Sequence, residues 1–267
     1  MQLTIEELLR NPLKDKLAAG QVVLSLIVRM SRGPEIAQIA ANAGFDTLYV
    51  DLEHSVLSLE TTSVICHSAR ASGLVPLVRV PAIDATLIGR LLDAGAMGII
   101  VPHVDCAEQA RHAVACAKYP PQGTRSTSST LGLLNYRNFS PAQANPMINA
   151  SVFIAVMIED PSALDKIDEI AAVEGVDMLF IGAGDLSNEL GIPGQWHSQK
   201  MMDSFSRVQM AATHYGKHVG LGGLANQPQL LEKLVAQGAR FLSLGTDLGL
   251  LASALEEKAK SAKYRLL

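Results

Sequence analysis

The fold is decided by the stretch Val156–Ser187, which reads VMIEDPSALDKIDEIAAVEGVDMLFIGAGDLS. Its two ends belong to apolar runs, Val152–Ile158 and Met178–Ile181, and the residues between them have helical spacing. A strand in which successive residues are all apolar buries both of its faces, which is typical of a parallel sheet covered on both sides. The stretch therefore predicts a strand, a helix and a second strand, with Glu159 and Asp185 following the two strands.

The same alternation recurs along the whole chain. Each of several helical segments is followed by a glycine just before the next strand, and a glycine commonly ends a helix. Eight strand–helix units predict a single α/β domain over residues 1–267, a (β/α)8 TIM barrel with a leading helix in residues 1–20 and a possible break in that helix at Asn11-Pro12. A doubly wound sheet is the alternative, although no GxGxxG follows the first strand. The predicted strands are Val22–Val28, Thr47–Val50, Val75–Val80, Gly98–Val101, Val152–Ile158, Met178–Ile181, His218–Leu221 and Phe241–Leu244.

Composition narrows the possible partners. The chain is 48% hydrophobic but only 4% aromatic, which predicts a large aliphatic core. A net charge of −4 gives no basic footprint for nucleic acid, and no apolar run is long enough to cross a membrane. The amino terminus lacks a signal-peptide pattern, and the three cysteines show no CxxC spacing. We expect a cytoplasmic protein without nucleic-acid or membrane partners.

Polar side chains gather where the predicted strands end. In a TIM barrel the carboxyl ends of the strands meet at one mouth, where the active site lies. The strand starts are mostly small or apolar, so this asymmetry predicts a single site. The polar residues at the strand ends are Asp51, Glu53, His54, Arg79, His103, Asp105, Glu159, Asp185, Thr246 and Asp247.

The chemistry of these residues suggests their roles. Glu159 and Asp185 are carboxylates on neighbouring strands, and they would suit a divalent metal with positions left open for water or substrate. Alternatively, the first caps a helix and the second is a turn residue. Arg79 is permanently charged and suits a carboxylate or enolate oxygen. Its alternative is a structural ion pair with Asp51 or Glu53.

A base and a carboxylate-binding backbone complete the predicted site. His54 is the histidine placed at a strand end beside acids, which makes it the best candidate for a general base. A buried packing histidine is the alternative. Gly182 and Gly184 allow a ligand to approach the backbone closely, and the N–H groups that follow would hold a carboxylate.

Several motifs together resemble the HpcH/HpaI family of metal-dependent, pyruvate-specific class II aldolases, which includes 4-hydroxy-2-oxo-heptane-1,7-dioate aldolases. The resemblance covers the chain from Val22 to the last helix. The motifs are Asp51-x-Glu53-His54, Val78-Arg79-Val80-Pro81, Leu91-Leu92-Asp93-Ala94-Gly95, Tyr119-Pro120-Pro121-x-Gly123-x-Arg125, Ile158-Glu159, Val173-Glu174-Gly175-Val176-Asp177 and Ile181-Gly182-x-x-Asp185-Leu186-Ser187.

The resemblance implies a TIM barrel, usually hexameric, whose last helix is exchanged between subunits. It implies Mg²⁺, Mn²⁺ or Co²⁺ as cofactor and cleavage of a 4-hydroxy-2-oxo acid to pyruvate and an aldehyde. By motif, the metal ligands would be Glu159 and Asp185, and Arg79 would bind the enolate oxygen. The remaining roles, also implied by the resemblance, are His54 as acid and base, Asp93 as its orienting partner, Asp51 as a support for the site, and the backbone of Gly184 and Asp185 as the pyruvate carboxylate site.

The chain departs from the family pattern in three places. Met157 stands where a glutamine commonly helps to hold pyruvate. Gly182-Ala183-Gly184 replaces the usual Gly-Pro-Ala, and the loop Ser126–Thr130 is more polar than usual. These changes concern the contacts to pyruvate and to the aldehyde, and they leave the metal ligands in place.

Three other functions remain open. Oxaloacetate decarboxylation would pass through the same enolate. A non-catalytic barrel that binds 2-oxo acids would result if Met157 marked a decayed site. A lyase acting on a citryl-CoA-like thioester is related, but the chain shows no evident basic patch for the CoA phosphates. The aldehyde and the choice of metal cannot be named from the sequence, because oxygen ligands suit all three ions.

Overall fold

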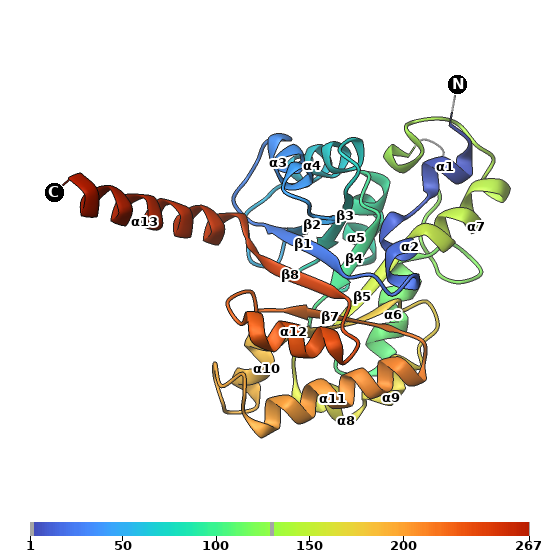
Figure 1. Cartoon of the computed structure of the whole chain (residues 1–267). Helices are drawn as coiled ribbons and strands as arrows, with labels where there is room; N and C mark the ends of the chain where they lie inside the picture. Colours follow the sequence, from blue (N-terminus) through green and yellow to red (C-terminus); the bar gives the residue numbers. More distant parts are fainter. Residues whose placement is uncertain (1–2, 129–130, 267) are drawn as a thin grey trace.

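The strands form a closed barrel in the computed structural model, which describes residues 3–128 and 131–266. All neighbouring strands are parallel and follow one another in chain order, with β8 returning to β1 (Figure 1). The predicted barrel is thus confirmed, and the doubly wound alternative was wrong. The strands are β1 (Val23–Val28), β2 (Thr47–Asp51), β3 (Val75–Arg79), β4 (Gly98–Val101), β5 (Phe153–Ile158), β6 (Met178–Gly182), β7 (His218–Gly222) and β8 (Phe241–Thr246).

Helices cover the outside of the barrel, and the glycines predicted to end them have left-handed backbone angles. Positive φ occurs at Gly44, Gly73, Gly95, Gly175 and Gly238. The helices between successive strands are α3 (Glu35–Asn42), α4 (Leu59–Ala71), α5 (Ala85–Asp93), α6 (Ala107–Ala117), α7 (Pro141–Ser151), α8 (Pro161–Asp165), α9 (Ile167–Ala171), α10 (Ala183–Glu189), α11 (Gln199–His214) and α12 (Pro228–Ala236), with a 3₁₀ turn η1 (Gly132–Leu134) before α7.

Two predicted helices are interrupted. The leading helix consists of α1 (Ile5–Leu9) and α2 (Pro12–Ala18), because Asn11 caps the second one by accepting from the Leu13 N–H at 3.1 Å. The predicted helix after β5 is divided into α8 and α9 at Lys166, whose backbone leaves the helical region. Neither break changes the order of the strands.

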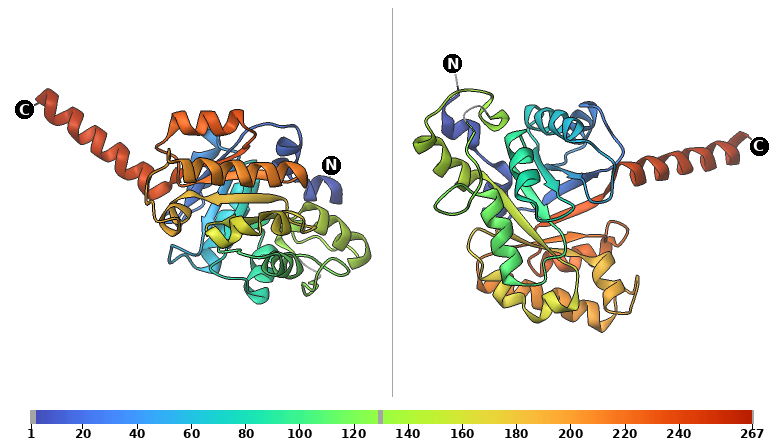
Figure 2. Two further views of the ribbon diagram at one scale, coloured as in Figure 1. Left: turned by 90° about the horizontal axis from the view of Figure 1, so that it is seen from below. Right: turned by 180° about the vertical axis from the view of Figure 1, so that it is seen from behind.

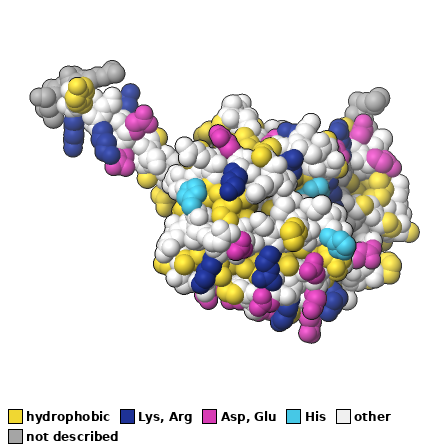
Figure 3. All heavy atoms as spheres, turned by 60° about the horizontal axis from the view of Figure 1, so that its bottom comes forward, with side chains coloured by type: hydrophobic (Ala, Val, Ile, Leu, Met, Phe, Trp, Pro, Cys, Tyr) yellow, Lys and Arg dark blue, Asp and Glu magenta, His cyan; other side chains and the backbone are white. Residues whose placement is uncertain are grey.

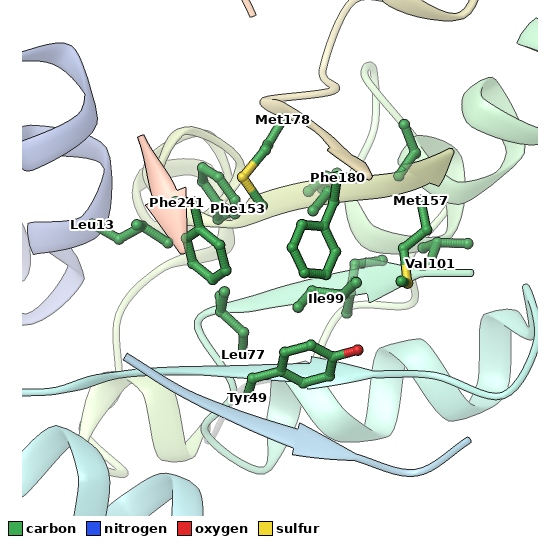
Figure 4. Packing of buried hydrophobic residues seen from close by; sticks show 14 of the residues in the cluster. Leu13, Tyr49, Leu77, Ile99, Val101, Phe153, Met157, Met178, Phe180 and Phe241 are labelled. Atoms are coloured by element: carbon green, nitrogen blue, oxygen red, sulfur yellow. The ribbon is translucent and has the colours of Figure 1, made fainter. Parts of the chain in front are cut away.

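Aromatic rings fill the inside of the barrel. Residues two apart on a strand lie on the same side, so each strand presents alternate residues to the interior. The Phe180 ring meets Tyr49 and Phe241 edge to face, with centroids 6.1 and 5.7 Å apart (Figure 4). Gly220 on β7 leaves room for this stack, since a Cβ there would lie 2.5 Å from Phe180 Cδ2.

The last helix, α13 (Asp247–Leu266), leaves the barrel instead of packing on it. It projects from the barrel in all three ribbon views (Figures 1 and 2). Its apolar side chains are exposed over the first turns, at Leu248, Leu250, Leu251 and Leu255. Within one chain, these side chains therefore have no core to enter.

Charged side chains of both signs are interspersed over one face of the molecule and along the projecting helix (Figure 3). None of the helices that the structure describes is both long enough and apolar enough to span a membrane.

The space beside Gly220 gives a test of the barrel packing. Gly220→Ala should lower the free energy of unfolding by about 1–3 kcal/mol, because the new methyl group presses on Phe180. Gly89→Ala is the matched control, since Gly89 lies inside α5 with open space around its Cβ position and should gain about 0.5–1 kcal/mol. Urea unfolding measures both, and equal effects would contradict the described packing.

Candidate active site

A cavity of about 410 Å³ opens at the carboxyl ends of the barrel strands. Its lining includes five acidic or basic residues, namely Arg29, His54, Arg79, Glu159 and Asp185. Met157, which stands at the usual glutamine position, also lines it and places its sulfur 3.8 Å from Arg79 Nη1. Of the polar residues predicted at the strand ends, His54, Arg79, Glu159, Asp185 and Thr246 therefore line one cavity, and the others lie outside its lining.

Asp51 is the most deeply buried polar group at this mouth, with its side chain fully shielded from solvent. Its Oδ1 and Oδ2 accept from Arg79 Nε and Nη2 at 2.9 and 2.7 Å, which is a bidentate pair. Oδ2 also accepts from Arg29 Nε at 2.6 Å. Burial opposes the charge of Asp51, but these hydrogen bonds hold its pKa below the ordinary value.

Asp51 also holds the chain that follows β2, because its Oδ1 accepts from the N–H groups of Glu53 and His54 at 3.1 and 3.3 Å. The ion pair that was the alternative reading of Arg79 is therefore real. Arg79 also lines the cavity, so structural pairing and exposure to a ligand occur together. Although burial lowers it, hydrogen bonding to Asp51 keeps the pKa of Arg79 above its usual range.

Glu53 and His103 link the arginine to the predicted metal ligand. Glu53 Oε2 lies 2.9 Å from Arg79 Nη1, and Glu53 Oε1 lies 2.9 Å from His103 Nε2. On its other side, His103 donates its backbone N–H to Glu159 Oε2 at 3.1 Å, with Nδ1 3.6 Å from the same oxygen. The backbone of His103 is left-handed, with φ of 54°, which aims this N–H at the carboxylate.

Glu159 is buried without a matching cation. It is 3% exposed, and among the described residues neither it nor Asp185 forms an ion pair with lysine or arginine. The pKa of Glu159 is raised to about 7, chiefly by burial and also by the nearby carboxylates of Asp185 and Glu53, while His103 opposes the change. Asp160, not Glu159, caps the following helix, by accepting from the Ser162 N–H at 2.6 Å.

These observations fit a divalent metal held by oxygen atoms. The carboxylates of Glu159 and Asp185 line the same cavity and are close enough for Asp185 to raise the pKa of Glu159, so a cation between them would neutralise both. Gly182 leaves room for the Glu159 side chain, because a Cβ there would lie 2.2 Å from Glu159 Oε1. No group of three or more His, Cys, Asp or Glu side chains is placed to hold a metal within the described parts of the chain. Two protein ligands leave the remaining positions to water and substrate, as Mg²⁺-type ions tolerate.

The predicted carboxylate-binding backbone lies directly after β6. Ala183 begins α10, so Gly184 and Asp185 occupy its first turn, where N–H groups have no partner within the helix. Both residues line the cavity.

His54 and Asp93 are not brought together within this chain. The His54 side chain is half exposed at the mouth, with Nε2 3.8 Å from Glu53 Oε2. Asp93 ends α5, which returns from the mouth to the amino ends of the strands, and its carboxylate accepts from Arg125 Nη2 at 2.6 Å. The predicted His54–Asp93 contact is therefore not formed within one copy of the chain.

The loop after α6 lies at the same far end, because α6 also runs back from the mouth. Within the loop Ser126–Thr130, residues 129 and 130 lie outside the described residues. The described part does not line the cavity of its own chain.

Arg29 was missed by the sequence reasoning. It is the first residue after β1, so the rule that strand ends carry function would have included it. Asp247 holds the backbone around it, since the N–H groups of Arg29, Met30 and Ser31 all donate to that carboxylate at 2.7–3.2 Å. Burial would raise the pKa of Asp247, but these bonds keep it below the ordinary value.

Removing the charge of Asp51 tests its structural role. Asp51→Asn should cost about 3–5 kcal/mol of unfolding free energy, because two guanidinium groups lose their shared buried anion. Asp15→Asn removes an exposed partner of Arg10 and should cost less than about 1 kcal/mol. Denaturant unfolding compares them, and similar losses would show that Asp51 does not hold the site together.

The raised pKa of Glu159 predicts a pH dependence of stability in metal-free protein. An acid whose pKa is higher when folded stabilises the protein below its unfolded value, and this contribution is lost as the pH rises through about 7. Between about pH 5 and pH 8, metal-free protein should lose about 2–3 kcal/mol more than Glu159→Gln does. The measurement is the free energy of unfolding of each protein at several pH values in this range. If it changes with pH equally in the two proteins, Glu159 is not protonated in the folded state.

The comparisons with known proteins agree with the geometry. Residues 26–254 match the family model described as HpcH/HpaI aldolase/citrate lyase. A 4-hydroxy-4-methyl-2-oxoglutarate aldolase from Chaetomium globosum is 40% identical over 254 residues, 94% of each chain. A hydroxypyruvate/pyruvate aldolase from Deinococcus radiodurans is 37% identical over 96% of this chain and 91% of its own.

A solved structure gives the same result. The crystal structure of an HpcH/HpaI aldolase from Desulfitobacterium hafniense DCB-2 superposes with a TM-score of 0.86 at 33% identity, covering 94% of this chain and 96% of that one. The predicted family is therefore confirmed: the chain belongs to the HpcH/HpaI aldolase/citrate lyase family and is a carbon–carbon lyase.

Proposed function

We propose that this chain is a metal-dependent aldolase that cleaves a 4-hydroxy-2-oxo acid into pyruvate and a second carbonyl compound. The observation that carries the proposal is the pair of carboxylates, Glu159 and Asp185, which line the same cavity as Arg79 and have no lysine or arginine partner among the described residues. The names of the relatives from C. globosum and D. radiodurans describe the same class of reaction.

Glu159 and Asp185 would hold Mg²⁺, Mn²⁺ or Co²⁺, whose charge supports negative charge on the keto oxygen of the substrate. The N–H groups of Gly184 and Asp185 would receive the substrate carboxylate. Arg79 lines the cavity with its side chain fixed by Asp51, and the terminal N–H groups that its ion pairs leave free would meet the oxygen on which charge develops.

His54 would act as the base. It would take the proton of the C4 hydroxyl of the substrate. The C3–C4 bond then breaks, and the electron pair of that bond enters the pyruvate enolate. The part of the substrate that contains C4 leaves as a carbonyl compound. Protonation of the enolate carbon then gives pyruvate. The side chain of His54 is half exposed and lines the cavity, which suits proton exchange with water.

The predicted role of Asp93 needs a contact that one chain does not make by itself, so it remains a prediction. The predicted homo-oligomer, a hexamer by resemblance, is supported by the exposed leucines of α13. Light scattering on purified protein would measure it. The cytoplasmic location predicted from the cysteines likewise remains a prediction.

Chelation tests the aldolase proposal. Pyruvate release from a 4-hydroxy-2-oxo acid should stop after thorough treatment with EDTA and return when Mn²⁺ or Mg²⁺ is added. Glu159→Gln should lose at least about a hundredfold in kcat/KM with the ion present, because one of two protein ligands is gone. Asp160→Asn, which alters only the adjacent helix cap, is the matched control and should keep most activity.

Three results would overturn the proposal. Full activity without any divalent ion would exclude the metal role. Tight binding of pyruvate with no turnover of any hydroxy-oxo acid would favour the non-catalytic barrel. Faster turnover of oxaloacetate than of every hydroxy-oxo acid would instead identify a decarboxylase that uses the same enolate.

A further inference from the structure

We propose that Arg29 is a specificity residue that binds a second carboxylate, carried by the half of the substrate that leaves as the carbonyl compound. Dicarboxylic 4-hydroxy-2-oxo acids, the class to which the substrate named for the C. globosum relative belongs, cleave into pyruvate and an anionic carbonyl compound. The new element is the residue that would hold the second carboxylate and so make this chain prefer that class. This inference rests on the proposed aldolase function and concerns only the acceptor half of the same cavity.

The position of Arg29 is fixed and open to the cavity. It follows β1 directly, its side chain is 31% exposed, and it lines the same cavity as His54 and Glu159. Asp247 binds three consecutive backbone N–H groups beginning at Arg29, so this turn is held in place. A side chain on a fixed turn can contribute to specificity with little loss of conformational entropy.

The hydrogen-bond donors of the two arginines are used differently. Each of the three nitrogens of Arg79 has a carboxylate partner, with Nε and Nη2 on Asp51 and Nη1 near Glu53, so only the second N–H of each terminal nitrogen is left for a ligand. Arg29 engages only Nε, on Asp51 Oδ2 at 2.6 Å. Within the described parts of the chain, its two terminal nitrogens have no hydrogen-bond or ion-pair partner.

The charges lead to the same conclusion. Asp51 is one anion shared between two guanidinium groups, and Glu53 supplies the second anion to Arg79. Arg29 is therefore the incompletely neutralised cation of the group. A guanidinium anchored through Nε presents its terminal nitrogens as a planar fork, which matches a carboxylate.

The cavity also has room for such a substrate. Its volume of about 410 Å³ lies in the range of small-molecule sites and exceeds what pyruvate alone needs. The 2-oxo acid end would occupy Glu159, Asp185 and Arg79, which leaves Arg29 for the far end. The step remains redox-neutral: the C3–C4 bond breaks, its electrons enter the enolate, and the hydroxyl proton leaves to the base.

Aldol addition with two acceptors tests the proposal in the metal-loaded enzyme. Glyoxylate carries a carboxylate, whereas glycolaldehyde is neutral and of similar size. Arg29→Gln should lower the ratio of kcat/KM for glyoxylate to that for glycolaldehyde by about tenfold to a hundredfold, the worth of one charge-assisted pair. Arg29→Lys should recover part of that ratio. Arg32→Gln, which removes a nearby exposed charge outside the cavity, should leave it unchanged.

A measurement without any acceptor separates this proposal from the aldolase proposal. Deuterium exchange into the pyruvate methyl group reports enolate formation alone. In Arg29→Gln it should fall much less than glyoxylate addition does. Equal losses in exchange and with both acceptors would show that Arg29 only supports Asp51 and would overturn the specificity role. Wild-type enzyme with no exchange in the presence of Mn²⁺ would instead overturn the aldolase proposal.

Discussion

The site depends on one buried anion. Asp51 is fully shielded from solvent, and its two oxygens hold the guanidinium groups of Arg79 and Arg29 together with the backbone of Glu53 and His54. A buried carboxylate is expensive to desolvate, so it is tolerated only because these donors satisfy it. Hydrogen bonds from two guanidinium groups and two backbone N–H groups offset the desolvation of Asp51, and they order these four groups. Each of them either lines the cavity or holds a residue that does.

Two other acids at the mouth, Glu159 and Asp185, lack the arginine partners that Asp51 has within the part of the chain that the structure describes. Glu159 and Asp185 lie near one another, and Glu159 is almost completely buried, yet the described residues supply no lysine or arginine for either of them. One cluster of the mouth is thus neutralised by the protein, and the other is left with uncompensated negative charge. This contrast explains why the pKa of Asp51 is lowered while burial raises that of Glu159 to about 7.

The barrel and the mouth could be predicted because both depend on local patterns. Apolar runs and the helix-ending glycines specify the strand order, and the carboxyl ends of parallel strands must share one rim, which brings Arg79, Glu159 and Asp185 together. The sequence offered an ion pair of Arg79 with Asp51 or Glu53 only as one alternative, because the distances between strands that decide it are not encoded locally. Arg29 was missed for a different reason: it follows β1 directly, but the strand-end rule was not applied to that strand. Asp93 was linked to His54 by motif alone, although α5 carries it away from the mouth.

The junction of β8 and α13 has a mechanical consequence. Asp247 is the first residue of the projecting helix, and its carboxylate is also what fastens the turn bearing Arg29. The projecting helix and the turn that carries Arg29 are therefore joined through one carboxylate. A displacement of α13 would be transmitted through Asp247 to this turn and would change the position of the Arg29 guanidinium.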